Sequence, residues 1–183
     1  MAGKLTFKPV TKARSADFDT LFEAPGSPKY CWCMTWRASS VELKDTTSPA
    51  RKTQMHLRID KGTTVGLLGY VGGEPVAWVS IAPRDTYARL GGPEAKPGDN
   101  IWSLACMFIR RQFRHQGYGT ELIAAAVAYA SKRGATTLEA YPVDPASPSY
   151  RFMGFIPAFE RAGFEEVGRE GRRRHVMRLA IKS

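Results

Sequence analysis

The sequence predicts one α/β (α+β) domain, built on a mixed sheet with helices on both of its faces. Apolar segments typical of strands stand before and after helical ones without strict alternation, as in folds with mixed sheets. The hydrophobic share of 43% is that of a globular protein, and no change of composition divides the 183 residues. We therefore expect residues 1–183 to form a single domain with one core.

The first hundred residues are expected to contain two helices and three strands. The expected elements are a strand at 5–10, helices at 13–23 and 50–60, the second with its start at Ser48-Pro49, and strands at 65–71 and 76–81 joined by a hairpin at 72–75. Residues 83–100 are rich in Pro, Gly and charged side chains. We expect a long loop there, which contributes to substrate specificity.

The second half is expected to run strand, helix, strand, helix and hairpin. The expected elements are a strand at 101–109, a helix at 121–133, a strand at 136–141, a helix from about residue 156, and a hairpin at 165–181 turning near Glu170-Gly171. In the strand at 101–109, simple alternation places Trp102, Leu104, Cys106 and Phe108 on one face, with Ala105, Met107 and Ile109 on the other.

Seven residues between that strand and the next helix form a candidate anion site. Glycines let the backbone approach a ligand, and the first turn of a helix offers unpaired N–H groups and the positive end of its dipole. We therefore predict that this loop holds a phosphate or pyrophosphate. Its residues are Arg114, His115, Gln116, Gly117, Tyr118, Gly119 and Thr120.

Three kinds of phosphate loop can be compared with this segment. A Walker-type loop is excluded because Thr120, and not lysine, follows Gly119. A dinucleotide fingerprint needs a third glycine where Leu122 stands and should begin directly at the end of the strand, although Glu139 lies at the distance of its ribose-binding acid. The third pattern, Arg/Gln-x-x-Gly-x-Gly/Ala, matches Arg114, Gly117 and Gly119.

This third pattern is that of the GNAT superfamily of acyl-CoA-dependent N-acetyltransferases, which the sequence resembles. The strand end and short link at 109–114, the Glu-Ala-Tyr-Pro-Val-Asp phrase at 139–144, and the tail at 157–164 ending in Gly-Phe also resemble this superfamily. The resemblance covers residues 101–181 well and the first hundred residues loosely. It implies a mostly antiparallel central sheet with helices on both faces.

The resemblance also implies acetyl-CoA as the acyl donor and a primary amine, on a small molecule or a peptide, as the acceptor. Transfer would be direct, within a ternary complex. In the family the central strand splays from its neighbour at a bulge, and the pantetheine arm lies in the gap. The main-chain groups that would bind the arm here are those of Met107, Phe108 and Ile109.

The catalytic side chains are harder to predict. Glu139 and Tyr141 share one face of their strand and are our candidates for base and acid, with Asp144 and Asp85 as further candidate bases. Many members of the family carry a tyrosine as general acid where this chain has Phe159, so Tyr150 is a second candidate acid.

The aromatic segment at residues 29–37 allows two interpretations. It is either a hydrophobic cluster that covers the sheet or the wall of the acceptor pocket, and the two are compatible. The acceptor-binding candidates are Tyr30, Trp32 and Trp36.

The net charge and the cysteine content indicate which ligands and which cellular compartment to expect. The net charge of +10, from 27 Lys and Arg against 17 Asp and Glu, suits a polyphosphate ligand and is compatible with nucleic acid without requiring it. Cys31, Cys33 and Cys106 are too few for a disulfide framework and have poor spacing for zinc, so we expect a reducing compartment, the cytoplasm, and no metal. No segment is long and apolar enough to span a membrane.

Two other functions fit parts of the sequence. One is a GNAT-shaped binding module without catalysis, associated with nucleic acid through its charge. The other is a dinucleotide-binding oxidoreductase. Turnover of acetyl-CoA would exclude the first, and thermal stabilisation by acetyl-CoA but not by NAD would exclude the second.

Overall fold

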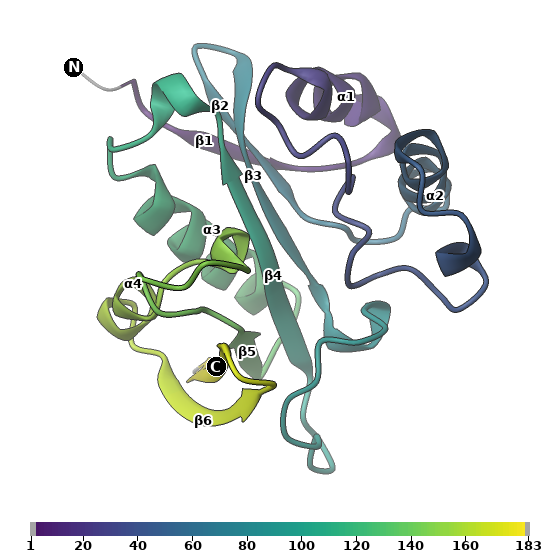
Figure 1. Ribbon diagram of the computed structural model, residues 1–183. Helices are drawn as coiled ribbons and strands as arrows, with labels where there is room; N and C mark the ends of the chain where they lie inside the picture. The colour runs from purple at the N-terminus through teal and green to yellow at the C-terminus, as the bar shows by residue number, and fades with distance from the viewer. Residues whose placement is uncertain (1–2, 182–183) are drawn as a thin grey trace.

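Seven strands form one sheet, in the order β1-β2-β3-β4-β5-β7-β6, in the computed structural model, which describes residues 3–181 (Figure 1). Neighbouring strands are antiparallel except β4 and β5, which are parallel. The predicted mixed, mostly antiparallel sheet is therefore confirmed. The strands are β1 (Thr6–Pro9), β2 (Leu67–Val71), β3 (Glu74–Pro83), β4 (Ile101–Ile109), β5 (Thr137–Ala140), β6 (Glu165–Glu170) and β7 (Arg174–Ala180).

Helices cover both faces of this sheet (Figure 1). The apolar sides of α1 (Ser15–Glu23) and α2 (Ser48–Asp60) pack with residues 32–34 against one face. The apolar sides of α3 (Tyr118–Lys132) and α4 (Ile156–Arg161) pack against the other face. Helix α2 begins where the sequence predicts it, because the Thr47 side chain accepts a hydrogen bond from Ala50 N and a proline occupies the first turn.

A bulge interrupts the alternation of β4. Ser80 of β3 is opposite Cys106, but the next residue, Ile81, is opposite Leu104, so Ala105 has no partner. An extra residue in one strand turns the side chains that follow it to the other face. Consequently Trp102 and Leu104 pack on the side of α3, whereas Cys106 packs on the side of α1 and α2.

The expectation that β4 alternates simply along its length is therefore wrong, because it assumed an unbroken pleat. The side chains of Met107 and Ile109 join Trp102 and Leu104 against α3, and Phe108 joins Cys106. The bulge thus turns Cys106 and Phe108 toward the segment between α1 and α2.

The parallel pair β4–β5 is short. Ile101 to Leu104 pair with Thr137 to Ala140, where β5 ends, while β4 continues for five more residues to Ile109. Residues 105–109 therefore have no strand partner on the β5 side among the residues that the structure describes. No helix within residues 3–181 combines the length and apolar character needed to cross a membrane.

Candidate functional site

The loop at residues 114–120 has main-chain donors available for an anion. No described protein group accepts a hydrogen bond from the N–H groups of residues 115–119. Gly117 precedes α3 with a left-handed φ of 82°, and a Cβ added at Gly117 or Gly119 would meet no atom within 4 Å. Free donors, open space above two glycines and the start of a 15-residue helix suit a pyrophosphate.

The side chains of this loop differ in their placement. Those of Arg114, His115, Gln116 and Thr120 are exposed. Tyr118 is 2% exposed, packs in the core on the α3 side, and donates a hydrogen bond to Gly3 O at 2.7 Å. Tyr118 therefore presents its main chain, and not its ring, to the loop surface.

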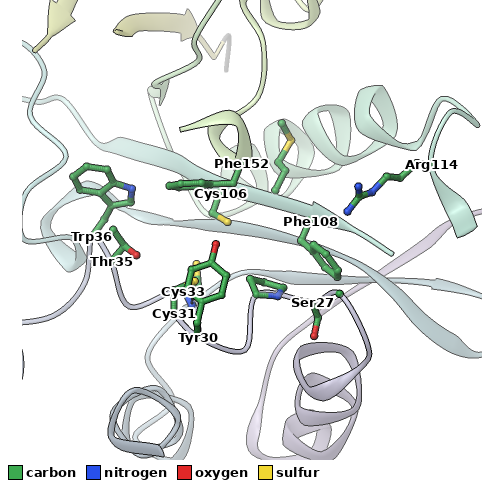
Figure 2. Close-up of a pocket in the computed structure, with 13 residues that line it drawn as sticks. Ser27, Tyr30, Cys31, Cys33, Thr35, Trp36, Cys106, Phe108, Arg114 and Phe152 are labelled. Carbon is green, nitrogen blue, oxygen red and sulfur yellow. Dashed lines mark hydrogen bonds between the residues drawn. The ribbon is translucent and has the colours of Figure 1, made fainter. Parts of the chain in front are cut away.

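A cavity of about 190 Å³ lies between β4 and the segment that joins α1 to α2 (Figure 2). Its β4 wall is Cys106, Met107 and Phe108, which follow the bulge, and Arg114 brings one end of the cavity to the candidate anion loop. Arg114 Nε donates to Ile109 O at 2.9 Å, which keeps the side chain beside the end of β4. The remaining lining residues are Gly26, Ser27, Pro28, Tyr30, Cys31, Cys33, Thr35, Trp36 and Phe152.

Two of the three candidate acceptor residues line this cavity. Tyr30 and Trp36 do, whereas Trp32 does not. The ring of Trp32 is 2% exposed and stacks on Phe22 at 5.5 Å, and its indole N–H donates to Ser48 Oγ at 3.1 Å. Trp32 therefore belongs to a hydrophobic cluster that covers the sheet, whereas Tyr30 and Trp36 line the cavity.

Glu139 and Tyr141 are brought together, but away from the cavity. Glu139 is fully buried and accepts hydrogen bonds from Arg178 Nε at 2.7 Å, from Arg84 Nη1 at 3.3 Å and from Tyr141 OH at 2.6 Å. Burial, then the negative charge of Glu139, raise the pKa of Tyr141 well above its ordinary value. The carboxylate of Glu139 is therefore occupied by three protein donors, and Tyr141 is a weak proton donor.

This network has a clear structural role. Arg84 and Arg178 each also donate a hydrogen bond of 2.7 Å to Pro93 O. A Cβ added at Gly92 would lie 2.5 Å from a carboxylate oxygen of Glu139. The buried acid therefore anchors the long segment at 84–100 to the sheet, because its two arginines hold the backbone of that segment.

The other candidate acids and bases occupy several places. Phe159 is fully buried and packs edge-to-face on Phe164 at 5.2 Å. The side chain of Asp144 is 65% exposed and lies 3.5 Å from His175 Nε2, while Asp85 lines a separate cavity beside the segment at 84–100. The ring of Tyr150 lies 6.1 Å from that of Trp36, but Tyr150 itself lines another hollow, with residues 170–174.

The cavity contains ionisable groups that the sequence interpretation did not assign. Burial raises the pKa of the Cys31 thiol to about 11, and hydrogen bonding with Cys33 raises that of Cys106. The pKa of Cys33 is lowered, first by the interaction with the Cys106 thiol and then by the charge of Arg37, against the opposing effect of burial. In the sequence, the signal for these groups is the Cys-Trp-Cys segment at 31–33, whose spacing is poor for zinc.

No metal-binding arrangement is found in the described part of the chain. Within residues 3–181, no group of three or more His, Cys, Asp or Glu side chains is arranged to hold a metal ion. All three cysteines are free thiols.

Comparison with known proteins agrees with this fold. Residues 29–155 match the Acetyltransferase (GNAT) family, and the chain therefore belongs to that family. Solved structures with the same fold include the PaiA N-acetyltransferase from Thermoplasma acidophilum in complex with coenzyme A, with 11% identity, a TM-score of 0.58, and 97% of this chain and 99% of that chain covered. A search of curated proteins finds no significant match.

Two further structures illustrate different acceptors within this fold. The aminoglycoside acetyltransferase AAC(6')-Ib in complex with coenzyme A is 18% identical, with a TM-score of 0.61 and coverage of 97% and 95% of the two chains. A ribosomal-protein alanine N-acetyltransferase from Escherichia coli is 15% identical, with a TM-score of 0.57 and coverage of 98% and 96%. At these identities the comparison shows the shared fold.

Proposed function

We propose that this protein transfers the acetyl group of acetyl-CoA to a primary amine, directly and within a ternary complex. The observation that carries the proposal is the meeting, at the end of β4, of the loop with free N–H groups and the 190 Å³ cavity. Membership of the GNAT family, and the coenzyme A bound in two structures of this fold, support the choice of donor.

The residues of this chain would act mainly by binding and alignment. The main-chain N–H groups of residues 115–119 would hold the pyrophosphate, and residues 107–109, whose edge lacks a strand partner, would bind the pantetheine amides. Acetyl-CoA supplies a thioester carbonyl for the amine to attack. Holding two reactants in the correct geometry contributes roughly 7–11 kcal/mol to catalysis.

The cavity lining favours an acceptor with an apolar or aromatic body. Among the described residues, no carboxylate belongs to the lining, and aromatic side chains contribute much of it: Tyr30, Trp36, Phe108 and Phe152. Such a surface gains free energy by burying apolar area and offers a polycation no partner for its charges. We infer an amine on a small aromatic molecule or on an apolar peptide end, and the reaction requires no nucleic acid.

Two measurements test this proposal. Acetyl-CoA well above its Kd should raise the Tm, whereas NAD at the same concentration should not, because only a ligand of the native state stabilises it. An acceptor screen that records the release of free CoA thiol should then find turnover, with aromatic amines ahead of polyamines. Absence of a Tm shift with acetyl-CoA would refute the donor assignment. A Tm shift with acetyl-CoA, without turnover of any amine, would favour a GNAT-shaped binding module without catalysis.

A further inference from the structure

The cavity lacks the usual kind of catalytic base. Among its described lining residues there is no carboxylate and no histidine, and the ionisable side chains are Tyr30, Cys31, Cys33, Cys106 and Arg114. Glu139 is outside the cavity and neutralised by two arginines. If the proposed acetyl transfer takes place here, a nearby proton acceptor has to come from this short set of side chains.

Cys33 is held in its place by an unusual backbone. Trp32 and Cys33 both have a left-handed φ, of 46° and 56°, although neither is glycine. A left-handed backbone is uncommon for residues other than glycine, and it persists only where the surrounding structure compensates for the strain. Here the buried ring of Trp32 anchors the turn, and Cys33 N donates to Cys31 Sγ at 3.4 Å. The strained turn places Cys33 in the cavity wall across from Cys106 of β4 (Figure 2).

Arg37, four residues after Cys33, is a buried cation without a carboxylate partner among the described residues. Arg37 is 2% exposed, and its Nη2 donates to Val65 O, Ser80 Oγ and Tyr87 OH at 2.7–2.9 Å. Its Nε and Nη1 have no hydrogen-bond partner, and no acidic side chain of the described residues forms an ion pair with it. A buried charge without compensation is costly, so an anion close to this guanidinium would be strongly stabilised.

The charged or titratable groups around Cys33 come from three parts of the chain. From its own segment these are Tyr30, Cys31 and Arg37, from β4 Cys106, and from the segment after β3 Tyr87. Ser80 and Trp78 of β3 add hydrogen-bond donors on the same side. Burial raises the pKa of Tyr87 to about 12, so this phenol is neutral. The thiol pair is therefore the one group in this set able to balance the charge of Arg37.

We propose that Cys33 is a thiolate stabilised by the nearby charge of Arg37 and that it accepts the proton of the acceptor ammonium. This role rests on the proposed function. The thiolate takes one N–H proton from the ammonium and becomes a thiol. The neutral amine forms a C–N bond at the thioester carbonyl, the C–S bond breaks, and the departing thiolate receives the second proton that the nitrogen loses. Cys33 then releases its proton to water, so one proton is produced for each amide formed.

Thiol reactivity tests the thiolate without any activity measurement. Wild-type protein is treated with iodoacetamide between pH 5 and 10, and the alkylated peptides are identified by mass spectrometry. We expect Cys33 to react with a half-maximal rate at a pH below the ordinary cysteine pKa of about 8.5. The fast reaction should disappear in Cys33→Ser and persist in Cys31→Ser. If every cysteine titrates at or above that value, or if the fast one is Cys31, the proposal fails.

Kinetics test the catalytic role. Cys33→Ser should lower kcat by about 10²–10⁴-fold and remove the acidic limb of the kcat/KM profile, because a serine hydroxyl does not ionise in this range. The rise in Tm with acetyl-CoA should remain. If the serine variant does not fold, loss of wild-type activity must follow alkylation of Cys33 one to one, and activity that survives complete alkylation refutes the proposal.

The outcomes separate the two proposals. Acetyl transfer that survives Cys33→Ser with an unchanged pH profile refutes only the role of Cys33. A wild-type protein that transfers no acetyl group to any amine refutes the proposed function and the role of Cys33 together.

Discussion

Glu139 of β5 and Arg178 of β7 face each other directly in the sheet register, and Arg178 Nε donates to Glu139 Oε2 at 2.7 Å. Arg84, from the segment after β3, also donates a hydrogen bond to the Glu139 carboxylate. Glu139 has no exposed surface, whereas the arginine side chains are 19% and 21% exposed. This arrangement makes Glu139 the anchor of the segment at 84–100, although its place in the sequence suggested a catalytic base.

Glu139→Gln should therefore destabilise the fold. Removing one partner of a buried pair costs about 3–5 kcal/mol, which lowers the Tm by roughly 6–12 °C at the lower end of that range. Proteolysis within residues 84–100 should become faster. The matched control is Glu74→Gln, since Glu74 pairs with Arg110 at the surface and should change stability by less than about 1 kcal/mol. An unchanged Tm together with a large loss of kcat would instead identify Glu139 as a base.

Trp32 and Trp36, four positions apart, should respond differently to alanine. Trp32→Ala removes a buried ring from the cluster with Phe18 and Phe22 and should cost about 3–5 kcal/mol of stability. Trp36→Ala removes part of the cavity wall and should raise the acceptor KM with a smaller loss of Tm and an unchanged response to acetyl-CoA. Thermal melting and acceptor kinetics on both variants distinguish them, and equal effects would contradict this separation.

Gly119→Val should abolish the rise in Tm with acetyl-CoA while leaving the fold intact. The new side chain would occupy the open space above the loop, and the backbone of Gly119, unlike that of Gly117, does not require a left-handed φ. Gly168→Val in β6 is the matched control, because a Cβ there also meets no atom within 4 Å. It should retain the full shift. Retention of the shift by Gly119→Val would show that the anion binds elsewhere.

Substitution of the two candidate phenols, Tyr150 and Tyr141, should also have different effects. Tyr150→Phe, beside the cavity residue Trp36, should lower kcat by about 10²-fold or less, since a CoA thiolate leaves fairly well without an acid. Tyr141→Phe removes the hydrogen bonds to Glu139 and Ser103 and should mainly lower the Tm. Full kcat and an unaltered basic limb in Tyr150→Phe would show that no phenol acts as acid.

The ion pair between Glu42 and Arg58 predicts a pH dependence of stability. Hydrogen bonding from Arg58 lowers the pKa of Glu42 to about 2, from 4.5. Because the folded state holds this proton less tightly than the unfolded state, the stabilisation is fully present above pH 4.5 and is lost as the pH falls toward 2. The Tm difference between wild type and Glu42→Gln should shrink across this interval. A difference that stays constant would mean that the pair contributes no pH-dependent stability.

Much of the architecture was predictable because it depends on short-range patterns. The helix at α2 follows from its Thr-Ser-Pro start, and the hairpin between β6 and β7 from its turn near Gly171. The bulge at Ala105 could not be predicted from such short-range patterns. A regular strand and a bulged strand at residues 101–109 are equally compatible with the apolar residues found there. Only the pairing with β3 determines where the side chains change face.

The family and the position of the candidate anion loop could be predicted from the sequence. Gly117, Gly119 and the helix start would act through main-chain groups, whose chemistry depends on neighbours in the sequence. The surroundings of Glu139, Trp32 and Cys33 depend on tertiary packing. The charge partners of Glu139 lie 55 and 39 residues away, and Cys106 and Ser80 reach Cys33 from two other strands. Burial and charge compensation set the reactivity of a side chain, and both arise when distant segments pack together.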